Sequence, residues 1–178
     1  MSAKTLAMRI LEGRKVRFDV IAFPETIHDA LGVAEYAGVQ PSLVFKTLVV
    51  LAPDRGARPM LILIPGGTTL DLRRAAEKLG FKRLQMASQA EAERLTGLKV
   101  GGISALSLLS KGFAVHLDRS AESLASIVVS AGQRGLNVRL RVEDFRRLTG
   151  AAWLDAARPD SEADAPQVDP SASESGGV

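Results

Sequence analysis

The spacing of apolar side chains changes several times along this chain, and each change predicts a new element. In residues 3–12 apolar positions recur every three to four residues, which is the period of a helix with one buried face. Residues 43–52 and 60–64 are almost continuously apolar, and they predict two buried strands joined by a turn. The same criteria predict helices over 28–38, 71–79, 88–97 and 142–148, and strands over 16–22, 115–117, 126–130 and 136–140.

Cap residues sharpen the ends of two of these helices. Asp71 can accept a hydrogen bond from the first turn of its helix, and Gly80 can end that helix in a left-handed conformation. Ser88 and Glu91 have the spacing of a capping box. Because strands and helices interleave without regular βαβ repeats, we expect a single α+β domain with a mixed sheet.

Composition divides the chain into a domain and a tail. The 178 residues suffice for one hydrophobic core, and 46% of them are hydrophobic. From residue 158 to 178 the chain is rich in Pro, Ser, Gly and acidic side chains and has no periodic apolar positions. We therefore expect a folded domain over residues 1–157 and a disordered acidic tail over 158–178.

The positive charge is concentrated in the domain. Five of the 20 acidic side chains lie beyond residue 158, which leaves 15 against 23 Lys and Arg, a net charge of +8. That excess suits a polyanion such as RNA, although a basic solvated surface with no nucleic-acid role fits it equally well. No apolar run approaches a membrane span, no signal peptide is evident and cysteine is absent, so we expect a cytoplasmic protein without a membrane partner.

Lys46 interrupts the most apolar strand. Side chains alternate along a strand, so Lys46 shares a face with Val44, Leu48 and Val50. Burying an unpaired ammonium is costly, so this side chain either reaches the rim of the sheet, the commoner arrangement, or points into a polar cavity. In a cavity it could bind a phosphate or a developing oxyanion.

Two glycine-containing segments could approach a ligand closely. The segment Gly101-Gly102-Ile103-Ser104 could offer backbone groups to a reacting carbonyl or ammonium, or be no more than a flexible loop. The pattern of residues 130–135 is typical of a hairpin turn. The second interpretation is a backbone anion cradle.

The sequence has no pattern typical of a metal site, a catalytic triad or a phosphate-binding loop. His28 and His116 are the only histidines, and neither accompanies an oriented nucleophile. An enzyme built on this chain would have to work by positioning and backbone electrostatics, with water or the substrate itself as the nucleophile.

Four segments carry a resemblance to a known family. They are residues 41–49 (PSLVFKTLV), 70–80 (LDLRRAAEKLG), 96–104 (TGLKVGGIS) and 129–137 (VSAGQRGLN). In this order and at these separations they closely resemble the YbaK/EbsC family, which includes the editing domain of bacterial prolyl-tRNA synthetases. The likeness spans about residues 5–155.

The resemblance implies a fold, a chemistry and partners. The fold would be a curved, barrel-like mixed sheet flanked by helices. Family members deacylate mischarged tRNA without a metal or a cofactor. In the Cys-specific branch the substrate thiol attacks its own ester, whereas other branches use water. The implied partner is the aminoacylated end of tRNA, with prolyl-tRNA synthetase as a second candidate.

The resemblance also implies residue roles. Lys46 corresponds to the essential lysine and would be catalytic. The pocket for the aminoacyl group and the terminal adenosine would be lined by Thr47, Phe23, Gly101, Gly102, Ile103, Ser104, Ala105, Ser130, Gly132, Arg134 and Asn137. The Cys-specific type usually has proline at the position of Ala105, tends to have tyrosine near Phe23 and Leu98, and commonly has aspartate at Asn137. These differences bear on which amino acid is removed.

The sequence as a whole predicts an editing hydrolase. We expect it to act in trans on mischarged tRNA, with Cys-tRNA(Pro) or another small aminoacyl-tRNA(Pro) as the substrate. The alternative is a non-catalytic accessory module that binds tRNA or prolyl-tRNA synthetase. A small-molecule esterase is a third reading.

Overall fold

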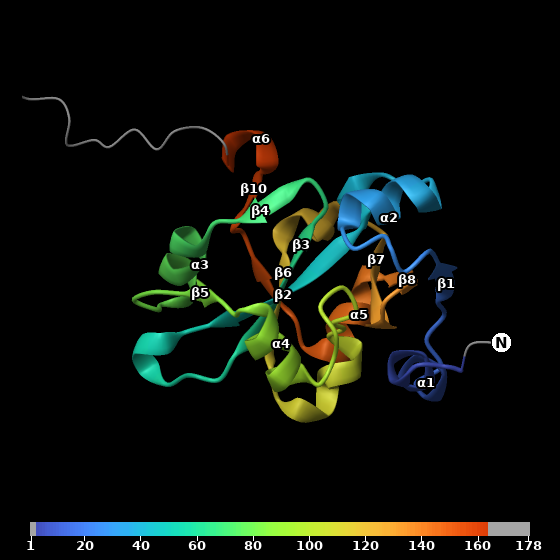
Figure 1. The fold of residues 1–178 in the computed structure, drawn as a ribbon, viewed down its shortest axis with the longest axis horizontal. Coiled ribbons are helices and arrows are strands. Elements are labelled where there is room, and N and C mark those ends of the chain that lie inside the picture. The colour runs from blue at the N-terminus through green and yellow to red at the C-terminus, as the bar shows by residue number, and fades with distance from the viewer. Residues whose placement is uncertain (1–2, 164–178) are drawn as a thin grey trace, which may run out of the picture.

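The computed structural model describes residues 3–163 (Figure 1). Its helices are α1 (Leu6–Gly13), α2 (Ala30–Ala37), α3 (Leu72–Leu79), α4 (Gln89–Thr96), α5 (Val142–Thr149) and α6 (Asp160–Ala163). Its strands are β1 (Asp19–Ala22), β2 (Phe45–Leu51), β3 (Met60–Pro65), β4 (Thr68–Leu70), β5 (Gln85–Met86), β6 (Ala114–Asp118), β7 (Ser126–Gln133), β8 (Leu136–Arg141), β9 (Ala152–Leu154) and β10 (Ala157–Pro159). Short 3-10 helices connect them: η1 (Pro41–Leu43), η2 (Pro53–Arg55), η3 (Leu106–Lys111) and η4 (Arg119–Ser123).

The strands form three sheets. The largest has the order β5-β2-β3-β6-β9, in which β2 and β3 are antiparallel while β3, β6 and β9 are parallel. A second sheet has the order β1-β8-β7, and β4 pairs with β10 in a third. The predicted α+β domain with a mixed sheet is thus confirmed. The barrel-like closure is wrong for the described residues, because the two larger sheets stay separate and one isolated bridge, between Val44 just before β2 and Val128 of β7, links them.

The predicted cap residues lie at the ends of their helices. The Asp71 side chain accepts a hydrogen bond from the Arg74 N–H at 3.0 Å, and Gly80 ends α3 at φ +75°. Ser88 and Glu91 form a reciprocal capping box at the start of α4. Caps of this kind contribute about 1 kcal/mol each.

Three hydrophobic clusters hold these layers together. The first lies between the two larger sheets, with Phe45 and Leu63 packed among side chains of α1, α4 and α5. The second covers the other face of the five-stranded sheet, where Ile62 packs under α3. In the third, α2 packs over Val44 and Val128. Full burial of an aliphatic side chain of this size stabilises the fold by roughly 1.5–3 kcal/mol.

Short elements are the ones that the sequence pattern does not predict. Strands β4, β5, β9 and β10 have two or three residues each, too few for a period to show. The boundary expected at residue 158 is also misplaced, because β10 and α6 carry regular structure to residue 163. The rest of the expected tail, residues 164–178, lies outside the described residues. No described helix combines the length and apolarity needed to cross a bilayer.

Candidate active site

Lys46 lies on β2 between the second and third hydrophobic clusters. Its neighbour Val44 belongs to the third cluster and Leu48 packs against the second, whereas Phe45 and Val49 face the first. The predicted sharing of one strand face is therefore confirmed. The side chain is half-buried, and its Nζ donates a hydrogen bond to the Thr68 carbonyl oxygen at 2.7 Å. No carboxylate of the described residues lies within 4.0 Å of this ammonium.

A glycine turn places the Thr68 carbonyl opposite Lys46. The Gly66 N–H donates to the Val44 carbonyl at 2.7 Å, which ties the turn between β3 and β4 to the chain just before Lys46. A Cβ on Gly66 would lie 3.0 Å from the Pro41 carbonyl oxygen, and Gly67 has φ +78°. The approach and the conformation both favour glycine, so this turn helps to position the lysine.

A small cavity of about 60 Å³ opens beside Lys46. It lies between the start of β2, the segment before α2, the glycine loop at 101–102 and the paired strands β7 and β8. The predicted site residues that line it are Phe23, Lys46, Gly101, Ser130 and Asn137. This volume equals only a few water molecules, so the cavity suits a small side chain.

A β-bulge sets the wall formed by β7 and β8. Ser130 pairs with Asn137 and Gln133 with Leu136, so β7 carries two extra residues at this point. Bulges of this kind re-aim side chains and occur often beside active sites. Ser130 Oγ accepts a hydrogen bond from the Gly132 N–H at 3.2 Å, which leaves its hydroxyl proton available.

The Asn137 carboxamide faces the cavity without a protein partner. Asn137 is 6% exposed, and its side chain has no hydrogen-bond partner among the described residues. Its polar atoms are not among the fully buried unpaired atoms, so they remain accessible from the cavity. Because Asn137 also lines the cavity, a polar ligand there could satisfy the amide.

The glycine loop packs directly on the β7–β8 turn. A Cβ on Gly102 would lie 2.8 Å from the Arg134 backbone nitrogen, so glycine is required for this contact. The Arg134 Nε in turn donates to the Val100 carbonyl at 2.8 Å. The Glu93 carboxylate accepts from the Val100 N–H at 3.1 Å, and that hydrogen bond lowers the pKa of Glu93. The loop is thus held from both sides rather than flexible.

The structure separates other predicted residues from the cavity. Thr47 points to the face opposite Lys46, and its hydroxyl is buried without a partner. Ile103 and Ala105 pack in the first hydrophobic cluster, and the buried Ser104 hydroxyl accepts from the Ser107 N–H at 3.3 Å. Gly102, Gly132 and Arg134 line a neighbouring cleft of about 530 Å³ that shares the glycine loop. Alternation along β2 already predicts the opposite face for Thr47.

Two polar residues outside the predicted site residues also line the cavity. They are His28 and Asp29, which lie just before α2. The signal was present in the sequence: Asp29 is the N-cap of α2, with its side chain accepting from the Gly32 N–H at 2.6 Å. Recognising that cap would have placed both residues in the loop before the helix.

The second histidine, His116, lies away from the cavity. His116 lies on β6, and burial lowers the pKa of its imidazole, which favours the neutral ring. Within residues 3–163, no three His, Asp or Glu side chains gather as metal ligands.

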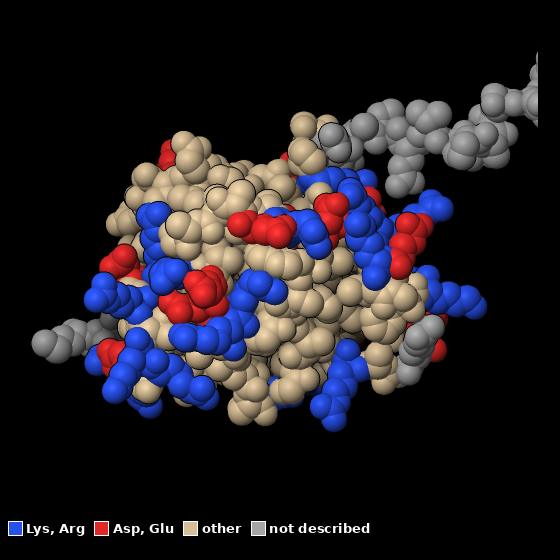
Figure 2. Space-filling view, turned by 180° about the vertical axis from the view of Figure 1, so that it is seen from behind, with Lys and Arg blue, Asp and Glu red and all other residues tan. Residues whose placement is uncertain are grey.

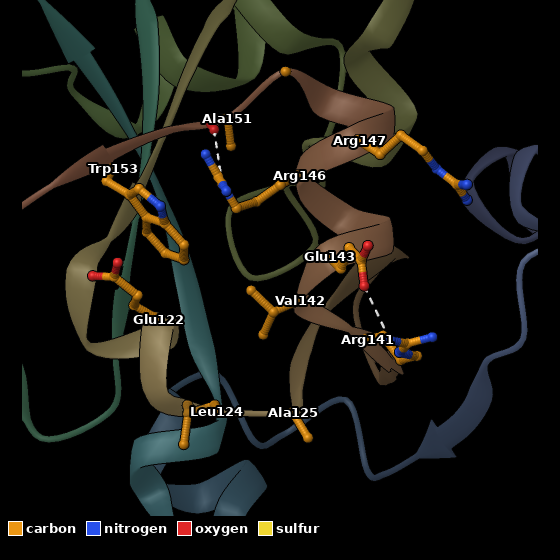
Figure 3. A pocket seen from close by; sticks show the side chains of 11 residues that line it. Glu122, Leu124, Ala125, Arg141, Val142, Glu143, Arg146, Arg147, Ala151 and Trp153 are labelled. Atoms are coloured by element: carbon orange, nitrogen blue, oxygen red, sulfur yellow. Dashed lines mark hydrogen bonds and ion pairs between the residues drawn. The ribbon is translucent and has the colours of Figure 1, made fainter.

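A larger pocket of about 640 Å³ lies elsewhere, between α5, η4 and β9 (Figure 3). Arg146 stacks over the Trp153 ring at 4.3 Å and donates from Nε to the Ala151 carbonyl at 3.2 Å. Arg141 and Arg147 are paired with Glu143 and Asp144 at 3.0 and 2.9 Å. None of the predicted site residues lines this pocket.

Comparison with known proteins places the chain in a family. The sequence model of the aminoacyl-tRNA editing domain matches residues 24–148, which include the lysine, the glycine loop and the bulged hairpin. The chain belongs to the aminoacyl-tRNA editing family. This confirms the predicted resemblance and the predicted enzyme class, an aminoacyl-tRNA deacylase.

Individual relatives agree with the family. The candidate Cys-tRNA(Pro)/Cys-tRNA(Cys) deacylase EbsC of Enterococcus faecalis is 34% identical over 154 residues, which are 85% of this chain and 92% of EbsC. The proline–tRNA ligase of Limosilactobacillus fermentum is 24% identical over 110 residues, which are 61% of this chain but 19% of the ligase. This chain is therefore similar to a segment of that larger enzyme.

A solved structure shows the same fold. A candidate trans-editing enzyme for prolyl tRNA synthetase superposes with a TM-score of 0.74 at 24% identity, covering 88% of this chain and 99% of that one. At this identity the likeness establishes the architecture, so the substrate has to be argued from the site.

Proposed function

We propose that this protein hydrolyses, in trans, the ester of a small amino acid mischarged to tRNA(Pro), with cysteine as the foremost candidate. The observation that carries the proposal is the Lys46 ammonium, held by the Thr68 carbonyl beside a small cavity and paired with no carboxylate of the described residues. A cation in this state is available to a phosphate or a developing oxyanion.

The cavity supports a small aminoacyl group. At about 60 Å³ the cavity is small, which favours a small side chain such as that of Cys, Ala or Ser. The similarity to EbsC and to proline–tRNA ligases supports tRNA(Pro) as the carrier and prolyl-tRNA synthetase as a candidate partner. With tRNA as the substrate, we retain the cytoplasm as the proposed location.

Each wall of the cavity has a role in the proposed reaction. Lys46 binds the phosphate of the terminal nucleotide or polarises the ester. Gly101 lines the cavity, and its N–H has no acceptor among the described residues, so it can donate to the carbonyl oxygen. Ser130 and Asn137 offer a hydroxyl and a carboxamide to the α-ammonium or the ribose. The nucleophile is water or, for a cysteinyl ester, the substrate thiol.

A deacylation panel tests this proposal. Release of labelled amino acid is measured from Cys-, Ala-, Ser- and Pro-tRNA(Pro) with the wild-type protein and with Lys46→Ala. We expect turnover of at least one small mischarged species, little turnover of Pro-tRNA(Pro), and a loss of about 100-fold or more in Lys46→Ala.

Two results would contradict the proposal. Equal rates for wild type and Lys46→Ala would remove the role of the lysine. Tight, salt-sensitive tRNA binding without deacylation of any species would indicate the accessory module instead.

A further inference from the structure

Another surface groove, which we call the arginine groove, lies at the opposite end of β8 from the Lys46 cavity. It encloses about 730 Å³ between the end of α1 and strands β1, β7 and β8. Arg17, Arg139 and Arg141 line it, together with Ser126 and Asp19. None of these residues lines the Lys46 cavity.

The cations of the arginine groove are largely free of carboxylates. Arg139 is held by a hydrogen bond from its Nε to the Ser126 hydroxyl at 2.9 Å, which leaves the guanidinium amino groups free to bind. Arg17 and Arg139 have no carboxylate within 4.0 Å among the described residues, while Glu12 at the rim is occupied by Lys4 at 2.8 Å. Figure 2 shows several Lys and Arg side chains gathered at this end of the molecule, where α1 and the N-terminus lie.

The backbone beside the groove is strained at a lysine. Lys15 has φ +57° and is the one non-glycine residue with positive φ in residues 3–163. The N–H of Lys15 donates to the Glu12 carbonyl and that of Val16 to the Leu11 carbonyl, the hydrogen bonds of a Schellman cap that usually has glycine at this position. A lysine is therefore present where glycine fits the backbone better, and such strain is typical of functional positions.

Strand β8 connects the groove to the cavity. Asn137, Arg139 and Arg141 share one face of β8, because side chains alternate along a strand. At about 3.4 Å per residue, Arg139 and Arg141 lie roughly 7 and 14 Å along the strand from Asn137. A nucleic acid whose 3′ end enters the cavity has its next nucleotides within this range.

We infer that the arginine groove binds the phosphate backbone of the tRNA acceptor arm, with Lys15, Arg17 and Arg139 as phosphate contacts. The inference rests on the proposed function. Its own support is charge complementarity and the shared face of β8. Phosphate contacts of this kind supply affinity without reading sequence.

Binding of uncharged tRNA(Pro) tests the groove separately from catalysis. Fluorescence anisotropy across a salt series is measured for the wild type, for the double variant Arg17→Gln/Arg139→Gln and for Lys15→Gly. We expect the double variant to raise Kd about tenfold at low salt and to reduce the slope of log Kd against log salt by about 2. Lys15→Gly should reduce the slope by about 1 while its melting temperature stays the same or rises, because glycine relieves the strain.

Arg73→Gln is the matched control. Arg73 is 92% exposed on α3, at the far end of the molecule from α1 (Figure 1), and we expect its Kd to remain within about twofold of wild type. Unchanged Kd and slope in both groove variants, or an equal loss in Arg73→Gln, would overturn the inference.

The two proposals fail differently. Groove-dependent tRNA binding without any deacylation would overturn the proposed function and leave the groove standing. Efficient deacylation, together with unaltered tRNA binding by the groove variants, would overturn the groove and support the proposed function. As a further check, the ratio of kcat/KM for full-length tRNA to that for the aminoacyl ester of adenosine should fall about tenfold in the double variant, since adenosine cannot reach the groove.

Discussion

The Lys46 cavity and the Trp153 pocket differ in how their polar groups are satisfied. The Trp153 pocket is about ten times larger, at about 640 Å³ against about 60 Å³. Each of its arginines already has a partner within the fold, either a carboxylate or the Trp153 ring with the Ala151 carbonyl. The Lys46 cavity instead has an ammonium without a carboxylate and, at Asn137, a carboxamide with no protein partner among the described residues.

Polar groups without protein partners, rather than volume, are therefore the basis for proposing the Lys46 cavity as the site. A satisfied group has little to gain from a ligand, because binding only exchanges one partner for another. An unsatisfied group gains the full value of a new hydrogen bond. The following predictions test the contrast, in order of decreasing effect.

Removing one cation from each region should give the largest difference in deacylation between the Lys46 cavity and the Trp153 pocket. We expect Lys46→Ala to lower kcat/KM for deacylation about 100-fold or more, which is about 2.7 kcal/mol of transition-state stabilisation. Arg146→Ala should change it less than about twofold while lowering the melting temperature, since it removes the contact with Trp153. Similar losses of deacylation activity in Lys46→Ala and Arg146→Ala would contradict the proposed difference between the two regions.

A methyl group at Gly102 should disturb the cavity through the glycine loop, which the cavity shares with the neighbouring cleft. In Gly102→Ala the new Cβ meets the Arg134 backbone at 2.8 Å, so the loop or the β7–β8 turn must move. We expect deacylation to fall about tenfold and the free energy of unfolding to fall by about 1–3 kcal/mol. Urea denaturation and the deacylation assay measure the two effects.

Gly13→Ala is the control for that change, because its Cβ would meet nothing within 4 Å. It should be neutral or stabilising by up to about 1 kcal/mol and leave activity unchanged. Full activity and stability in Gly102→Ala would show that the close approach does not constrain the site.

Truncating the Asn137 amide should affect activity more than stability. Asn137→Ala removes a group that donates to no protein partner, so we expect an unchanged melting temperature and a fall of about 2- to 10-fold in kcat/KM. Thr96→Val provides the opposite case. It removes a buried hydroxyl bonded to the Ala92 carbonyl at 2.7 Å, so stability should fall and activity should not. A large stability loss in Asn137→Ala would mean that the amide serves the fold.

The smallest effect concerns acid pH and lies outside both regions. Burial lowers the pKa of His116, so the folded state takes up a proton less readily than the unfolded chain. This histidine therefore contributes its full stability above its unfolded pKa of about 6.5, and the contribution is lost as pH falls below that value. We expect the melting temperature of His116→Leu to fall less than that of wild type between pH 8 and pH 5. Parallel curves for the two proteins would contradict the role of His116.

The main elements could be predicted because their signals are local. The apolar run of β2, the capping box of α4 and the glycine end of α3 each depend on residues close together in the chain. Strands of two or three residues, such as β4 and β10, form only because partners distant in sequence pair with them.

The sequence by itself determined that a lysine interrupts a buried strand, that a Gly-Gly pair at 101–102 could approach a ligand closely, and that four segments resemble an editing family. Only the tertiary structure decided which residues lie beside Lys46. The cavity joins Phe23, Gly101 and Asn137 from three separate segments and excludes Thr47, which is adjacent to Lys46 in the chain. The physical reason is that strand alternation sends neighbours to opposite faces, while hydrogen bonding and packing bring distant segments together.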